Sequence, residues 1–144
     1  KNKYILNPKQ LRFLDKNISK ISNLSKEFNF VCLITNQPQI SMGLISYEVL
    51  DEIHSLLIKH CLKLDLRIDL ITFCPHHPHA GFFNEIKIIK QDCFCRKPQP
   101  GMILEQEFAR NIDLKNSLLI GDSITDKKAA DNAGVPFKNI NKIL

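Results

Sequence analysis

The sequence predicts an α/β protein with a Rossmann-like, doubly wound parallel sheet, and two observations support this. The short apolar run at 30–34 lacks polar alternation, which suits a parallel strand covered on both faces, and two further strands are expected at 68–73 and 117–120. Polar residues follow each run, where open α/β sheets form their ligand crevice. The length of 144 residues, without a repeat or a linker, predicts one domain over 1–144.

Two helices are expected in the first half of the chain. Asn7 and Pro8 form a favourable helix start, an N-cap followed by proline, so we expect a helix over about 8–26. Ser46 is expected to cap a second helix, whose apolar positions recur at helical spacing. His54, inside this helix, is expected at its surface or boundary because no motif surrounds it.

Two more helices are expected in the second half. The pattern over 102–110 predicts a helix with Ile103 and Phe108 facing inward. The last helix is expected over 127–133, with a glycine directly past its end.

Four metal-ligand side chains form two tight pairs, Cys74-Pro75-His76 and Cys93-Phe94-Cys95, which sixteen residues separate. Thiolates and imidazole suit a tetrahedral Zn²⁺ ion, and four protein ligands would leave no position for a catalytic water. The sequence therefore predicts a structural zinc loop over 74–95. His77 and His79 are alternative imidazole ligands, and the competing interpretation is that the cysteines are ordinary buried residues.

Polar and charged residues beside these strands suggest an anion site. Arg96 and Lys97 leave the metal loop directly before a helical pattern, so two cations would be held by a rigid loop. Thr35 and Asn36 follow the first strand and are candidates for gripping a phosphoryl group, although both are also common turn residues.

Two carboxylates follow the third strand. Asp122 comes directly after a glycine, and Asp126 lies four residues on, where a helix begins. Such an arrangement suits a hard divalent cation such as Mg²⁺. The competing interpretation is that Thr125 or Asp126 simply caps the helix.

Composition limits the partners. The net charge of +5 and pI near 9.0 come from lysines spread along the chain, which disfavours nucleic acid as a partner. A modest positive field would still attract a phosphorylated small molecule. There is no apolar run of 18 residues, so no membrane contact is expected, and five cysteines used partly as ligands indicate a reducing compartment, the cytoplasm. We expect a monomer.

Taken together, four motifs give the chain a resemblance to the haloacid dehalogenase superfamily of phosphatases, in its zinc-loop branch. They are Thr35-Asn36-Gln37, Cys74-Pro75-His76-His77-Pro78, the run from Cys93 to Met102, and Gly121-Asp122-Ser123-Ile124-Thr125-Asp126. The long insert and the Arg-Lys-Pro-x-Pro-Gly-Met run are more like the branch members that act on a heptose bisphosphate than those that act on histidinol phosphate.

The resemblance implies a role for each matching residue. Thr35 and Asn36 would hold the transferring phosphoryl group, Lys97 would neutralise its charge, and Arg96 would contact a sugar-phosphate substrate. Asp122 would bind Mg²⁺, with Asp126 supporting that site. The surface-polysaccharide context of such an enzyme also comes wholly from the resemblance.

One part of the superfamily pattern is missing from these residues. Its phosphatases carry an Asp-x-Asp-Gly segment on the first, central strand, whose first Asp attacks phosphorus, and no Asp-x-Asp precedes Thr35. We therefore expect the nucleophile to lie outside the 144 residues, which alone would be inactive. The alternative is a zinc-bearing module that binds ligand without turnover.

Overall fold

The computed structural model describes residues 4–79 and 81–144, which divide into two compact units. The first unit consists of Lys1–Leu33, Gln37–Ile71 and Pro75–Asp92, and the second of Ile34–Asn36, Thr72–Cys74 and Cys93–Leu144. The candidate polar residues at the ends of the strands belong to the second unit.

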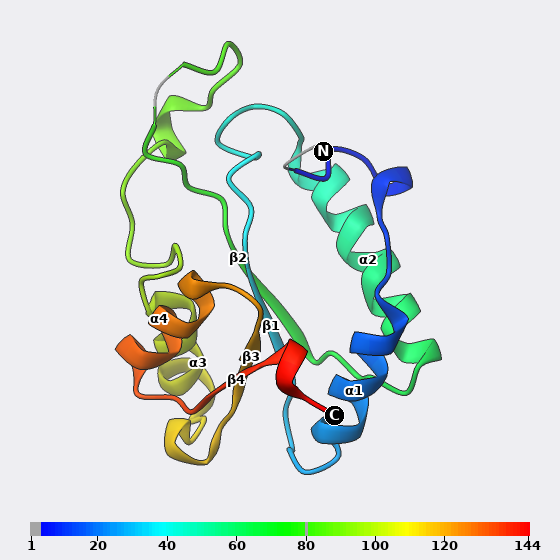
Figure 1. The fold of residues 1–144 in the computed structure, drawn as a ribbon. Coiled ribbons are helices and arrows are strands. Elements are labelled where there is room, and N and C mark those ends of the chain that lie inside the picture. Colours follow the sequence, from blue (N-terminus) through cyan, green and yellow to red (C-terminus); the bar gives the residue numbers. More distant parts are fainter. Residues whose placement is uncertain (1–3, 80) are drawn as a thin grey trace. The chain divides into compact units, whose positions relative to one another are not determined.

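Within the part of the chain that the structure describes, four short strands alternate with helices, which confirms the α/β class (Figure 1). Strand β1 (Cys32–Asn36) pairs with β2 (Leu70–Cys74). Strand β3 (Leu119–Gly121) runs parallel to β4 (Phe137–Asn139), with Leu119 opposite Phe137. Among the described residues the strands therefore form two pairs instead of one continuous sheet.

The first helix is shorter than its sequence pattern predicts. Asn7 accepts a hydrogen bond from the Lys9 N–H at 3.0 Å, but it caps only a 3-10 turn at Pro8–Gln10, and α1 spans Asp15–Ser25. The ring of Phe13, between the two elements, stacks on His60 with centroids 3.7 Å apart. Phe13 and His60 lie far apart in the sequence, so the local residue pattern that predicted the helix carried no information about this contact.

Helix α2 (Tyr47–Lys63) begins as predicted, because the Ser46 hydroxyl accepts the Val49 N–H at 3.3 Å. Its buried face meets α1 in a small core centred on Ile18, Cys61 and Leu66. His54 belongs to the buried residues of α2, so its expected boundary position was wrong. A 3-10 turn at Lys87–Ile89 follows in the insert between the metal-ligand pairs.

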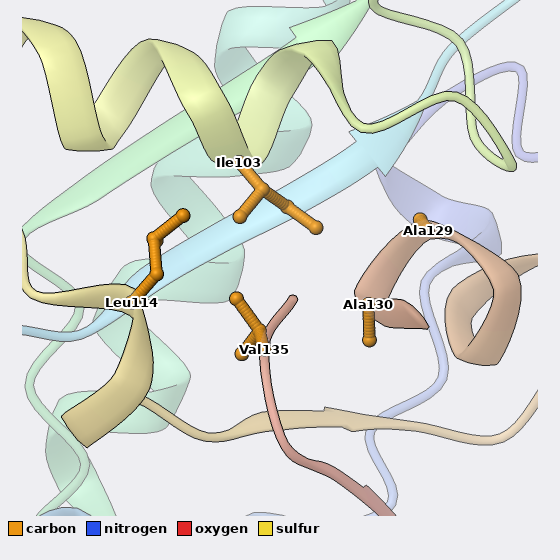
Figure 2. Close-up of a cluster of buried hydrophobic side chains, with 5 residues drawn as sticks. All are labelled: Ile103, Leu114, Ala129, Ala130 and Val135. Carbon is orange, nitrogen blue, oxygen red and sulfur yellow. The ribbon is translucent and has the colours of Figure 1, made fainter. Parts of the chain in front are cut away.

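The second unit packs α3 (Gly101–Arg110) and α4 (Ile124–Ala133) around one apolar cluster. Figure 2 shows its five members, whose side chains gather from both helices and the adjoining turns: Ile103, Leu114, Ala129, Ala130 and Val135. Burial of this kind stabilises by roughly 25 cal/mol per Å² of apolar surface. The cluster thereby holds together the two helices that carry candidate site residues.

One prediction about the residues of these helices was wrong, and two others were confirmed. Phe108 is 93% exposed, so its expected inward orientation was wrong, whereas Ile103 is buried as predicted. Gly134 ends α4 with a positive φ of 72°, the left-handed conformation that a C-terminal glycine supplies. Shorter 3-10 turns at Leu114–Asn116 and Ile140–Lys142 complete the unit. In the described ranges, no helix combines the length and apolarity needed to cross a bilayer.

Candidate active site

The four residues predicted to bind zinc come together. The sulfur of Cys74 lies 3.4 Å from that of Cys93 and 3.0 Å from that of Cys95, and 3.2 Å separates the latter two. His76, two residues after Cys74, contributes a ring nitrogen to the same group, whose ligand atoms all lie within 4.8 Å of one another. Within the described residues, none of these three cysteines forms a disulfide bond.

The donor set fits a tetrahedral metal ion. Bonds of about 2.3 Å would hold sulfurs about 3.8 Å apart, so the sulfurs need to separate by less than about 1 Å. Cys74 is fully buried, and burial raises the pKa of the Cys95 thiol. The Nδ1 of His77 instead accepts the N–H of His79 at 3.2 Å, which engages one ring nitrogen of that alternative ligand.

Lys97, two residues past Cys95, lies against the end of β1. Its ammonium donates to the Ile34 carbonyl at 3.1 Å and to Oδ1 of Asp126 at 2.7 Å. An ammonium has three hydrogens, so, with these two acceptors among the described residues, a third remains for an incoming anion. The Lys97 side chain is 15% exposed, which makes this a largely buried charge with a fixed direction.

Asn36 contacts the backbone of the same lysine. Its Oδ1 accepts the Lys97 N–H at 3.0 Å, and its Nδ2 donates to the Lys97 carbonyl at 3.0 Å. Strand β1 extends two residues beyond its predicted end, so Thr35 and Asn36 lie inside the strand and not after it. Successive strand residues face opposite sides, so Thr35 presents its half-buried side chain to the other face.

Asp126 has a partner for each carboxylate oxygen. Oδ1 pairs with Lys97, while Oδ2 accepts the Ser123 hydroxyl at 2.6 Å and the Ser123 N–H at 3.1 Å. Burial favours the protonated acid, but the hydrogen bonds from Lys97 and Ser123 outweigh it and hold the pKa of Asp126 below its usual value. Asp126 thus stays ionised as the counter-charge of Lys97.

Ser123 is the cap of α4, whereas Thr125 or Asp126 was predicted in this role as the alternative to metal binding. Ser123 and Asp126 bond each other's backbone reciprocally in a capping box, so α4 begins at Ile124 and not near Lys127. The spacing Ser-x-x-Asp was a signal that could have found this cap. Ile34 was also missed, because a backbone carbonyl leaves no trace in a sequence pattern.

Two candidate residues of this unit remain, Asp122 and Arg96. Asp122 directly follows β3, its carboxylate is exposed, and its N–H donates to Oδ2 of Asp126 at 3.3 Å. Arg96 is half-buried between Cys95 and Lys97. The second unit therefore gathers a lysine, two aspartates and the end of β1 beside a metal-binding cluster, an arrangement suited to holding an anion and a divalent cation.

Comparison with known proteins shows the family. The D-glycero-beta-D-manno-heptose-1,7-bisphosphate 7-phosphatase of Rhodopseudomonas palustris is 32% identical over 133 residues, which is 92% of this chain and 72% of that protein. A family model described as HAD-hydrolase-like matches residues 94–138. The chain belongs to the haloacid dehalogenase-like phosphatases.

Two further comparisons agree with this family. A D-glycero-alpha-D-manno-heptose-1,7-bisphosphate 7-phosphatase of Photorhabdus laumondii is 36% identical, over 83% of this chain and 61% of that protein. The crystal structure of the D,D-heptose 1,7-bisphosphate phosphatase of B. bronchiseptica, complexed with magnesium and phosphate, has a TM-score of 0.78 and 28% identity. It covers 95% of this chain and 70% of that one. Magnesium dependence is typical of this phosphatase family.

Proposed function

We propose that this phosphatase hydrolyses D-glycero-D-manno-heptose 1,7-bisphosphate to the 1-phosphate, as a Mg²⁺-dependent step in lipopolysaccharide synthesis. Two relatives that carry this activity in their names are 32% identical to the chain over 133 aligned residues and 36% identical over 124. The relatives include both anomers, so the proposal leaves the anomer open.

The ion pair of Lys97 and Asp126, at 2.7 Å, is the observation that carries the proposal. Phosphoryl transfer spreads negative charge over equatorial oxygens, and catalysis depends on fixed cations that meet this charge. Lys97 is fixed by its counter-ion and keeps a hydrogen for the phosphoryl oxygen. Asp122, exposed at the end of β3, offers a carboxylate to Mg²⁺.

The neighbouring residues take complementary roles. The hydroxyl of Thr35 would donate to the phosphoryl group, and Arg96 would bind the sugar-phosphate substrate, because a guanidinium matches phosphate oxygens in pairs. Asp126 would support the magnesium site through Asp122 and Lys97. Magnesium, when bound, would neutralise charge on the transferring group.

We also propose that the cluster of Cys74, His76, Cys93 and Cys95 holds a structural Zn²⁺ ion. Three thiolates and one imidazole complete a tetrahedral shell, so this metal would shape the loop that leads to Lys97 and take no part in hydrolysis. Thiolate ligands persist in a reducing compartment, and we assign the protein to the cytoplasm.

No nucleophile is assigned among these residues, because the 144 residues contain no Asp-x-Asp segment. The proposed roles therefore concern the phosphoryl group, the substrate and the metals. This same feature supports a second candidate, a metal-bearing module that binds a sugar phosphate without hydrolysing it.

The test is phosphate release by the complete gene product with Mg²⁺. We expect turnover of the heptose bisphosphate to exceed that of histidinol phosphate, and Lys97→Ala to lower kcat/KM by about 10³. Lys127→Ala removes the same charge from an exposed pair and should change kcat/KM less than twofold. Tight sugar-phosphate binding without release would favour the module, and preferred release from histidinol phosphate would overturn the substrate.

A further inference from the structure

We propose that Asn36 is a positioning residue for Lys97 and not a direct ligand of the phosphoryl group. Its side-chain amide fixes the backbone from which the lysine side chain extends. This inference rests on the proposed function of Lys97.

The two hydrogen bonds between these residues form a matched pair. The amide oxygen accepts the Lys97 N–H and the amide nitrogen donates to the Lys97 carbonyl, both at 3.0 Å. If the amide were rotated by 180°, its NH2 group would face the Lys97 N–H and its oxygen would face the Lys97 carbonyl. Only the observed orientation therefore satisfies the contact. Asn36 therefore binds the main chain of Lys97 as a neighbouring strand would.

The other end of the lysine returns to the same strand. Its ammonium donates to the Ile34 carbonyl at 3.1 Å, so Lys97 lies along β1 from Asn36 back to Ile34. The ammonium also donates to Oδ1 of Asp126, at 2.7 Å. Backbone and charge of one residue are thus held separately, which leaves the side chain little freedom to move.

Strand alternation explains why Asn36 serves this purpose. Ile34 packs against the apolar cluster of the second unit, and residues two apart in a strand face the same side. Asn36 consequently faces that side as well, while Thr35 faces the other. The oxygen of the Asn36 amide and one of its two N–H groups are engaged by the Lys97 backbone, which commits this side chain to positioning the lysine.

This contact matters for catalysis because it sets the position of the Lys97 ammonium. Fixed cations stabilise a transition state only when they lie where charge develops, and a misplacement of about 1 Å can cost 10²-fold in rate. Replacing Asn36 would free the loop at Lys97 without touching its charge.

Amide hydrogen exchange of the 144-residue chain tests the contact without any activity. Asn36→Ala should accelerate exchange of the Lys97 amide at least tenfold, because its acceptor is lost. Asn36→Asp keeps an acceptor for that N–H, so exchange should stay within threefold of wild type. Asn132→Ala is the matched control, since the Asn132 side chain donates to the Pro98 carbonyl of the same loop, at 3.0 Å. Unchanged exchange in Asn36→Ala, or equal acceleration in Asn132→Ala, would overturn the proposal.

A double-mutant cycle on the complete gene product tests the role. Asn36→Ala should lower kcat/KM by about 10² in the wild-type background and by less than twofold in the Lys97→Ala background. Equal losses in both backgrounds would mean that Asn36 acts on the substrate directly, and the inference would be wrong. Should the wild type release no phosphate, the proposed function fails, while the exchange measurement still decides whether Asn36 positions Lys97.

Discussion

Asp126 joins the cap of a helix to the counter-charge of a lysine in one buried side chain. A carboxylate that leaves water loses hydration, and this cost is offset only when hydrogen bonds and an opposite charge replace the lost water. Ser123 and Lys97 do so here, one on each oxygen. Removing the charge of Asp126 should therefore disturb both the start of α4 and the position of Lys97.

We expect Asp126→Asn to destabilise the protein by about 2 kcal/mol, the usual value for a hydrogen bond to a charged group in a buried site. Urea denaturation at neutral pH measures this change. The control is Asp131→Asn, in the pair of Lys127 and Asp131 whose side chains are 59% and 54% exposed, where the loss should stay below about 0.5 kcal/mol. Equal effects of the two substitutions would contradict the interpretation of Asp126 as a buried counter-ion.

The same residue should make stability depend on pH. Because the folded protein holds the pKa of Asp126 below its ordinary 3.8, the unfolded chain binds this proton first as the pH falls. The contribution of Asp126 is complete above pH 3.8 and is lost as the pH drops through the lowered pKa. The stability difference between wild type and Asp126→Asn, both freed of metal, should shrink on acidification below pH 4 in urea titrations. A difference that grows on acidification would refute this sign.

At the level of elements, local patterns predicted the existence of helices and strands better than their ends. Ser46 and Gly134 marked true helix ends, because caps depend on backbone groups within one turn. The end of β1 was placed too early, since Thr35 and Asn36 look like turn residues until Lys97, 61 residues away, satisfies the Asn36 amide. Local polarity alone could not reveal that partner.

Gly101 is the first residue of α3, and it lies against the backbone of the metal loop at Phe94. A Cβ at Gly101 would lie 2.3 Å from the Phe94 carbonyl oxygen, and the Gly101 N–H donates to the same oxygen at 2.9 Å. Gly101→Ala must therefore shift the backbone between Cys93 and Cys95, at a cost of about 1–3 kcal/mol. We expect weaker zinc binding in a competition titration with a chromophoric chelator.

The control separates this effect from a general loss of stability. Gly134→Ala meets no atom within 4 Å but requires a left-handed alanine at φ 72°, which costs about 1–2 kcal/mol. Its zinc affinity should match the wild type. A similar fall in zinc affinity for both substitutions would show that global destabilisation, and not the metal loop, accounts for the result.

For the whole molecule, the sequence predicted which candidate site residues come together better than it predicted how the strands pair. The spacing of four metal-ligand residues and of two aspartates after a strand survives in sequence as short motifs, and the structure brings each set together. The pairing of strands and the contacts of Phe13, Phe108 and Lys97 depend on residues far apart in the chain. Such non-local contacts are decided by tertiary packing, which outweighs local preference.

Zinc binding would join the two segments on either side of the insert, and it should therefore stabilise the folded chain. Zinc that binds only the folded chain should stabilise it by about 2.7 kcal/mol at a hundredfold excess over Kd, raising the thermal midpoint. Binding should release protons, because burial raises the pKa of the Cys95 thiol and the ion requires a thiolate. Cys95→Ser should abolish the zinc response, whereas Cys61→Ala, in the core with Ile18 and Leu66, should lower stability and retain it. An equal zinc response in the two variants would exclude the cluster as the metal site, because only one of them alters a proposed ligand.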